Sequence, residues 1–334
     1  MAWLQPCVAQ DFIFSDFNRT PLLINPALTG NFNGKVRARA GHRNQWSEVL
    51  SGTSFQSHFV SVDTRLDVDD NQNFGFGLSG LRDVGGALDF GSKSLNFSAA
   101  YERKLISTKK STHSIRLGLE GGIVRRSIDL SDARWPSQHD GNGGFDPTIP
   151  APELEGIDSD FLIADVNGGL FWQSIFSDGS AFYLGLAAHH LNRPNVSFFV
   201  DEEEKLSTRY TIHGGGEIRL TQAWSMMPTF LYVDQGEHSA FIGGALARRY
   251  FDRSASTSLQ AGILVRANKD LSGSLQTNAI TPTVNLLLKR LNLGIAVDIT
   301  TSQLAEVSYN GAIEVSLGYV FGAITAPKVV LVQE

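Results

Sequence analysis

The sequence predicts an all-β protein, a transmembrane antiparallel outer-membrane β-barrel of about 14 strands. Apolar residues recur at every second position in about 14 segments, a period that gives a strand one apolar and one polar face. Long and short connections alternate between these segments, as in barrels with long outer loops and short periplasmic turns. The chain contains no run of about 18 apolar residues, which excludes a helical membrane protein.

The composition is compatible with such a barrel. Hydrophobic residues make up 42% of the 334-residue chain, and the mean hydropathy is −0.08. In an alternating strand the apolar and polar residues cancel in the mean hydropathy, so a low mean hydropathy does not argue against a membrane barrel. The 33 glycines also fit an all-β chain. A net charge of −6 and a pI near 5.8 argue against a nucleic-acid partner.

Residues 1–9 resemble the end of a secretory signal peptide. Cys7 and Ala9 place small residues at positions −3 and −1 of a cut before Gln10. The basic region and the full apolar region of a signal are missing, which indicates a truncated signal or a misplaced start codon. Cys7 as a lipid-attachment residue is the alternative, which Pro6 disfavours. After the cut the chain has no cysteine, which suits an oxidising compartment.

Residues 10–34 do not alternate as a strand does. Pro21 and Pro26 interrupt them, and their aromatic and aliphatic residues make them too apolar for a free tail. We therefore expect this N-terminal segment to pack into the barrel as a plug.

The barrel itself is expected over residues 35–321. In its last strand Ile313, Val315 and Leu317 share one face, and Glu314 and Ser316 share the other, which predicts lipid on the odd face and the lumen on the even face. A soluble β-sandwich also alternates, but it seldom needs this many strands of about ten residues. The predicted strands are residues 35–42, 54–66, 73–81, 93–105, 113–125, 160–173, 180–190, 208–220, 223–233, 239–248, 256–266, 279–288, 291–300 and 309–321.

The connections favour the barrel over the sandwich, because they sort by strand parity. Connections that leave even-numbered strands are short, while those that leave odd-numbered strands include residues 43–53, 82–92, 126–159, 191–207 and 267–278. Residues 301–308 are intermediate and residues 234–238 are a short exception. An even strand number brings both chain ends to the periplasmic side, so residues 322–334 are expected to form a periplasmic tail. Pro228 and Pro282 fall inside the ninth and twelfth strands, where we expect bulges or kinks.

The polar face of the predicted strands carries charges of both signs. Such residues hold a plug through paired charges or line a polar channel, and the mixed signs favour neutralised internal networks over a selective pore. The predicted luminal set is Arg116, Glu120, Asp165, His213, Glu217, Arg219, Arg266, Asp298 and Glu314.

No constellation predicts an enzyme, a metal site or a cofactor. Residues 140–146 resemble a calcium loop loosely, but Gly144 and Ala151 stand where ligands are needed, so a Gly/Asn-rich turn is favoured. His189 and His190 are neighbours in a predicted strand and are expected to point to opposite faces. The chain shows no nucleophile–base pair, no phosphate-binding loop and no glycosidase carboxylate pair, so we expect no catalytic residues and a non-enzymatic protein.

Three stretches resemble the PorP/SprF family of outer-membrane proteins, which is associated with type IX secretion in the Bacteroidota. The first comprises residues 14–17 (FSDF), 21–30 (PLLINPALTG) and 43–46 (RNQW). The second is residues 73–79 (NFGFGLS), and the third comprises residues 183–197 and 209–215. The resemblance covers most of the chain after residue 9, and the combination of Asn25-Pro26-Ala27 with Arg43-Asn44-Gln45-Trp46 is its most specific part.

The resemblance implies an outer-membrane location, a barrel related to the fatty-acid-transporter type, and a role in secreting or anchoring large surface proteins, including gliding adhesins. Expected partners are outer-membrane lipid, a secreted type IX substrate or surface adhesin, and periplasmic type IX components. We expect partner contacts in the longest loops, at Trp135, Asp146, Arg193, Pro194 and Phe198. A fatty-acid-transporter-like channel for hydrophobic small molecules and a porin are the alternative functions.

Overall fold

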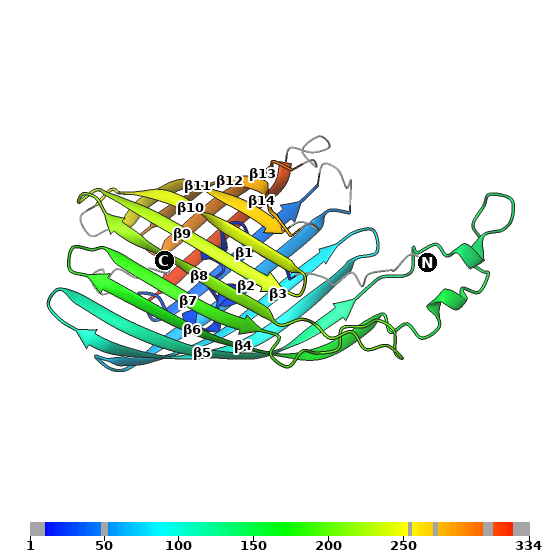
Figure 1. The fold of residues 1–334 in the computed structure, drawn as a ribbon, viewed down its shortest axis with the longest axis horizontal. Helices are drawn as coiled ribbons and strands as arrows, with labels where there is room; N and C mark the ends of the chain where they lie inside the picture. The colour runs from blue at the N-terminus through cyan, green and yellow to red at the C-terminus, as the bar shows by residue number, and fades with distance from the viewer. Residues whose placement is uncertain (1–10, 48–52, 253–255, 270–272, 303–309, 323–334) are drawn as a thin grey trace.

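The computed structural model describes residues 11–47, 53–252, 256–269, 273–302 and 310–322. Within these residues fourteen antiparallel strands close into one barrel, in which each strand pairs with its chain neighbours and β1 pairs with β14 (Figure 1). The predicted fold class and strand number are therefore confirmed. The predicted signal peptide, residues 1–9, and all but Gly322 of the predicted tail lie outside the described residues.

The strands are longer than the apolar alternation indicates. Their bounds are β1 Val36–Gln45, β2 Phe55–Asp69, β3 Gln72–Gly85, β4 Phe90–Ser107, β5 Ser111–Ser127, β6 Asp160–Phe176, β7 Ala181–His189, β8 Arg209–Arg219, β9 Trp224–Gln235, β10 His238–Tyr250, β11 Thr257–Lys269, β12 Leu275–Leu288, β13 Leu291–Thr300 and β14 Asn310–Phe321.

The helices of the described residues are single turns. They are η1 (Phe17–Arg19), α1 (Pro21–Ile24) and η2 (Pro26–Leu28) near the N-terminus, and η3 (Pro136–Gln138) and η4 (Pro152–Leu154) in the longest loop. In the part of the chain that the structure describes, no helix has the length and apolar character needed to cross a membrane.

The two faces of the barrel wall differ as the period of two predicts. On β5, Leu117 and Leu119 point outward and Leu119 is 69% exposed, whereas the neighbouring Arg116 points inward and is 0% exposed. The same division holds on β14, where Ile313, Val315 and Leu317 are exposed and Glu314 is buried. The exterior is thus an apolar band, and the lumen is lined mainly by polar side chains.

The connections define two ends of the barrel. Residues 128–159 and 190–208 are the longest described connections and leave the same end, here called the long-loop end; residues 128–159 reach well beyond the barrel (Figure 1). The opposite, short-turn end carries tight turns such as residues 70–71 and 289–290, and there Val36 of β1 pairs with Phe321 of β14.

Two predicted loops are wrong in their bounds. Residues 82–92 are mostly strand, because the β3–β4 ladder continues to Gly85 and Phe90 and leaves only residues 86–89 as a turn. Residues 267–278 shorten in the same way, since β11 runs to Lys269 and β12 begins at Leu275. Main-chain pairing continues where the apolar alternation has ended, and the predicted strand bounds rest on that alternation.

The expected disturbances at the two prolines are gaps in the ladders. Pairing between β8 and β9 passes from Gly215–Thr229 to Ile218–Met226, and pairing between β12 and β13 skips the positions around Pro282. The other edges of both strands stay paired, as expected for prolines that lack one donor each. The register also places Pro228, Ala245, Ile263 and Pro282 in one cross-strand row.

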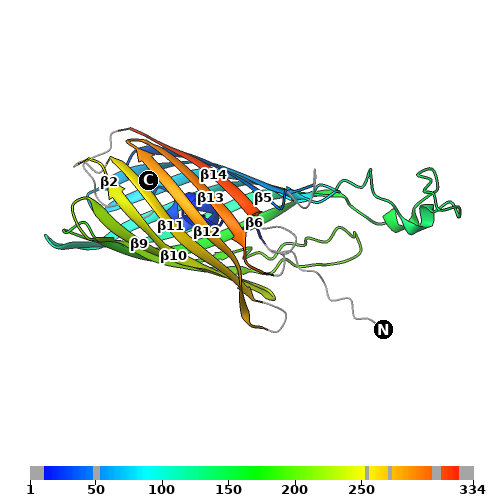
Figure 2. The same ribbon diagram turned by 90° about the horizontal axis from the view of Figure 1, so that it is seen from above.

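Residues 11–34, here called the luminal segment, lie inside the barrel (Figure 2). The segment begins at the long-loop end, where Asp11 contacts His190 and Arg209, and it continues into β1 at the short-turn end. Three apolar clusters join it to the wall; the largest packs Phe17 and Ile24 against β9, β10 and β11. The core of this protein is therefore the contact between the luminal segment and the barrel wall.

Candidate functional site

The luminal segment is held mainly by its own main-chain groups, which buried charged side chains of the wall bind. Glu314 of β14 accepts hydrogen bonds from the main-chain N–H groups of Ser15, at 2.7 Å, and Asp16, at 3.0 Å. Arg43 of β1 forms an ion pair with Glu314 and a second one with Asp298, where the distance between Nη2 and Oδ2 is 2.9 Å. Two carboxylates thus share one buried guanidinium and position the turn at Ser15. This group of Arg43, Asp298 and Glu314 is here called the first anchor.

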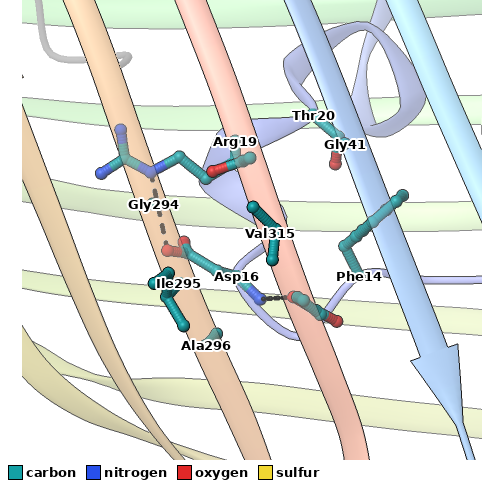
Figure 3. Close-up of a pocket in the computed structure, with 11 residues that line it drawn as sticks. Phe14, Asp16, Arg19, Thr20, Gly41, Gly294, Ile295, Ala296 and Val315 are labelled. Atoms are coloured by element: carbon teal, nitrogen blue, oxygen red, sulfur yellow. Dashed lines mark hydrogen bonds and ion pairs between the residues drawn. The ribbon is translucent and has the colours of Figure 1, made fainter.

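Asp16 and Arg19 extend this contact toward β11 and β12. Asp16 accepts hydrogen bonds from Thr283 Oγ1 at 2.8 Å and Asn285 Nδ2 at 3.1 Å. Its carboxylate also lies 3.5 Å from Arg19 Nε, the contact drawn in Figure 3. The pocket drawn in Figure 3 lies between these residues and the wall. It has room for about one water molecule, so it is a packing gap and no ligand chamber.

Arg116 of β5 holds the opposite side of the segment. Its guanidinium donates to the carbonyl oxygens of Ala27, at 2.9 Å, and Thr29, and it forms an ion pair with Glu102 of β4. The main chain of the segment packs directly against β5 at Gly118. A Cβ atom added to Gly118 would lie only 2.2 Å from the main-chain nitrogen of Ala27. A glycine at this position is needed for the close approach.

A second buried pair holds the segment before it enters β1. Asp63 of β2 accepts hydrogen bonds from Gly30 N at 2.8 Å and from Arg37 Nη2 at 2.7 Å. Arg37 also donates to the carbonyl oxygens of Leu28 and Asn31. The pair therefore satisfies charges and main-chain groups together, which a buried ion pair needs in order to be stable.

Asn25 binds the wall at β6, β7 and β8. Its amide nitrogen lies 3.0 Å from Leu170 O, 3.1 Å from Leu186 O and 3.1 Å from His213 Nε2, while its side-chain oxygen accepts the N–H of Ala27. The last bond caps the turn η2, as an asparagine before a helical turn commonly does. The Asn25-Pro26-Ala27 motif is thus a local turn whose capping residue also binds the lumen.

A histidine closes the site at the long-loop end. His190 Nε2 lies 2.6 Å from Asp11 Oδ2 and its Nδ1 lies 2.8 Å from Asp165 Oδ1, while Arg209 binds Asp11 at 3.0 Å. Burial opposes the protonation of His190, but the charge and hydrogen bond of Asp11, together with Asp165, outweigh burial and raise the pKa of His190 to about 9. Burial also acts against the Asp11 carboxylate, yet Arg209 and His190 outweigh it and lower the pKa of Asp11.

The prediction that His189 and His190 point to opposite faces is wrong. β7 ends at His189, and His190 adopts a φ of 58°, which turns its side chain toward the segment. His189 also faces inward and lies 3.2 Å from Ile24 O. Among the residues that the structure describes, no group of three or more His, Cys, Asp and Glu residues is placed to hold a metal ion.

The nine predicted luminal residues divide by their contacts. Arg116, His213 and Glu314 bind the segment as described. Asp298 accepts a hydrogen bond from Ser15 Oγ at 2.8 Å, and Arg266 donates to Ile13 O and Ser15 Oγ. The remaining four contact other wall residues: Asp165 binds His190, Glu120 accepts from Asn167, Glu217 pairs with Arg248 and Tyr250, and Arg219 lies 4.2 Å from the centre of the Tyr250 ring.

Sequence reasoning missed Arg37, Arg43, Asp63 and Glu102, which are all buried and all bind the segment or its immediate partners. Arg37 and Arg43 share one face of β1, so the period of two could have identified them. The apolar pattern instead predicts a loop at Arg43, because charged and amide residues end the alternation of that strand.

The two long loops form a single structure at the long-loop end, here called the loop platform (residues 128–159 and 190–208). Asp158 N donates to Phe198 O at 2.8 Å and Val200 N donates to Gly156 O at 2.9 Å. Phe198 packs against Phe90 and Phe161 at the barrel rim, and Arg126 lies over its ring. Phe199, 49% exposed, and Val200, 69% exposed, remain on the surface.

The residues predicted to contact a partner are distributed over this platform. Trp135 and Asp146 are half-buried in residues 128–159, where Thr148 lowers the pKa of Asp146 through hydrogen bonds from its hydroxyl and main-chain N–H. Arg193 is exposed, and Pro194 and Phe198 are half-buried. The turn at residues 140–146 is closed by Asp140, which accepts from the N–H groups of Asn142 and Gly144.

Comparison with solved structures finds other membrane barrels at low sequence identity. The toluene transporter TbuX of Ralstonia pickettii matches with 13% identity and a TM-score of 0.47, over 93% of this chain and 95% of that one. The toluene transporter TodX of P. putida matches with 11% identity and a TM-score of 0.40, over 90% and 94%. CdiB from Acinetobacter baumannii matches with 7% identity and a TM-score of 0.45. The match covers 85% of this chain but only 60% of the CdiB chain.

Comparison with curated protein sequences finds no match. Comparison with sequence families matches residues 7–319, nearly the whole chain, to the family described as type IX secretion system membrane protein PorP/SprF. This match agrees with the closed barrel and its apolar exterior. The chain therefore belongs to the PorP/SprF family of type IX secretion system membrane proteins and is a β-barrel of the outer membrane.

Proposed function

We propose that this barrel is a non-enzymatic component of type IX secretion that binds a secreted substrate or surface adhesin through its loop platform. The observation that carries the proposal is the platform itself: its two longest loops are joined by main-chain hydrogen bonds and fixed to the rim by an aromatic cluster. Ordered loops of this length on a rigid barrel are commonly functional.

The platform also carries the negative charge of the protein. Its two loops contain eleven Asp and Glu residues and three Lys and Arg residues, an excess larger than the net charge of −6 of the whole chain. Exposed Phe199 and Val200 lie next to the acidic run at residues 201–204. A partner surface that combines basic and apolar residues would complement this combination.

The proposal places the long-loop end outside the cell and the short-turn end in the periplasm. The start of β1 and the end of β14 meet at the short-turn end, so in this orientation they face the periplasmic components of the machine. The filled lumen supports a role at the surfaces of the barrel, because the luminal segment occupies the space through which a porin would conduct.

A platform deletion tests the proposal. Residues 131–155 and residues 199–204 are each replaced by a short Gly-Ser linker in one tagged variant, and the proteins that co-purify after detergent extraction are compared with those of the parent. The matched control replaces the turn at residues 108–110, at the short-turn end. We expect loss of one secreted protein, and of its surface attachment, only in the platform variant. Unchanged partners and unchanged surface attachment would reject the proposal.

One observation favours the alternative of a channel for hydrophobic small molecules. The ladder gaps at Pro228 and Pro282 lie in one cross-strand row, and the luminal face of β9, β10 and β11 carries the largest apolar cluster of the described residues. In this alternative the gaps mark a lateral opening and the luminal segment is a movable hatch. Uptake of an apolar compound that is lost in a strain without the protein would favour it, while measured single-channel conductance would favour a porin.

A further inference from the structure

Three cations form a continuous row on the outer wall near the long-loop end, here called the cationic row: Arg82, Lys93 and Arg125. The register pairs Arg82 of β3 with Lys93 of β4, and Lys93 with Arg125 of β5. All three side chains are exposed and share the outward face with Leu78, Leu95 and Ile123 on their own strands. The row continues as His58 and His42, which are paired with each other across β2 and β1.

The rows next to the cationic row have the character of a membrane boundary. On the side toward the middle of the barrel, Val60, Gly80, Leu95 and Ile123 form the next outward row, and Val62, Leu78, Phe97 and Gly121 form the one after it. On the side toward the loops, the next row is Gln56, Val84, Gly91, Ser127 and Asp160, of which Val84 is buried and the other four are polar residues or glycine. The cations therefore lie where an apolar wall gives way to a polar and small-residue rim, at the depth of lipid headgroups.

The cationic row places like charges side by side, which is electrostatically unfavourable for the protein when no anion is bound. Side chains directly opposite each other on neighbouring strands are about 5 Å apart at Cβ, and like charges at that separation repel. Arg125 is compensated by an ion pair with Asp160 of β6. Within the described part of the chain, neither Arg82 nor Lys93 has a carboxylate within ion-pair distance. The charge of Lys93 is partly balanced at longer range by Asp160, while Arg82 has no such compensation among the described interactions. An anionic group bound between these two side chains would remove the repulsion.

We propose that the cationic row and the apolar rows beside it bind a phosphorylated glycolipid of the outer leaflet. The phosphates would lie on Arg82 and Lys93, and the acyl chains would lie along the apolar rows of β2 to β5. Two interstrand steps separate Arg82 from Arg125, about 10 Å in all, which suits a wide headgroup with more than one anionic group better than a single phosphate. The assignment shares one assumption with the proposed function, namely that the long-loop end faces outward.

Lipid binding by the purified protein tests this inference without any type IX component, so its outcome is independent of the secretion proposal. The variant Arg82→Gln/Lys93→Gln is reconstituted in nanodiscs, and its affinities for lipid A, phosphatidylglycerol and phosphatidylethanolamine are measured by native mass spectrometry. The matched control is Arg249→Gln/Lys289→Gln, which removes the same charge at the short-turn end. Heat-modifiable gel mobility checks that both variants remain folded barrels.

We expect the parent to prefer lipid A over both phospholipids, and the variant to lose roughly thirtyfold in affinity for lipid A. The control should bind lipid A as the parent does, and added salt should weaken parent binding more than variant binding. Equal affinity of parent and variant for lipid A would overturn the site. Equal affinity of the parent for lipid A and phosphatidylglycerol would overturn the assignment to a glycolipid.

Discussion

Removal of the Glu314 carboxylate should release the luminal segment. In the first anchor, Glu314 accepts the N–H groups of Ser15 and Asp16 and pairs with Arg43. The variant Glu314→Ala removes both acceptors. Water cannot easily replace them, because Ser15, Asp16 and Arg43 are all buried.

The size of the effect follows from these contacts. A buried donor left without a partner costs about 1–3 kcal/mol, and two donors lose their acceptor here. Arg43 keeps its ion pair with Asp298 at 2.9 Å, so the change does not leave a buried charge unpaired. We expect the segment to be destabilised by about 3 kcal/mol, which raises the equilibrium constant for its release about 100-fold.

Thiol labelling measures that release. The chain has one cysteine, Cys7, which falls in the predicted signal, so Leu22→Cys introduces a probe into the buried part of the segment. Labelling of the probe should be about 100-fold faster with Glu314→Ala. The matched control is Glu120→Ala, because Glu120 is also a buried luminal glutamate, but it is bonded to Asn167 of the wall and not to the segment. Equal labelling rates in parent and Glu314→Ala would refute the reasoning.

Three further changes probe other contacts of the segment. His190 titrates near 6.5 when unfolded and has a pKa of about 9 in the fold, so its contribution is fully present below about pH 6.5 and is lost as the pH rises through about 9. Because thiolate formation alone speeds labelling as the pH rises, the labelling rate of Phe12→Cys is divided by that of a free thiol at the same pH. This ratio should rise over that range, and His190→Gln should remove the rise. Pro228→Ala restores a donor facing β8, so exchange of the Gly216 amide, which lies opposite in the register, should slow, and unchanged exchange would contradict this account of the gap. Gly118→Ala should destabilise the protein by about 1–3 kcal/mol in thermal unfolding, whereas Gly121→Ala, whose added Cβ meets nothing closer than 4.0 Å, should not.

The sequence predicts the barrel well because all of its strands share the same alternation of apolar and polar residues. Each strand alternates, so errors in single strands do not change the fold, and the apolar character of Leu117 and Leu119 is enough to identify Arg116 between them as luminal. The strand ends are less predictable. At Arg82 and Lys93 the outward face changes from apolar to charged, and main-chain pairing, which leaves no trace in side-chain pattern, continues past that point.

The contacts of the segment were less accessible to sequence reasoning for a related reason. Arg116, Asp63 and Glu314 bind main-chain atoms of Ala27, Gly30 and Ser15, and a main-chain acceptor or donor has no sequence signature. His190 adds a second difficulty, because its inward position depends on a positive φ that alternation cannot anticipate.

The luminal charges and the segment stabilise each other, so neither is expected to keep its structure alone. Three arginines of the lumen are almost completely buried: Arg37, Arg43 and Arg116. Each forms an ion pair with a carboxylate of the wall, and each also donates a hydrogen bond to the luminal segment. Without the segment, these side chains would face an open lumen, and the carbonyl groups of Ala27 and Leu28 would lose their donors. Because a buried charge is stable only when its partners are complete, the segment is part of the barrel interior rather than an added stopper. We expect its release to begin at Asp11 beside His190, where the segment meets the loop platform and the Asp11 side chain is 24% exposed.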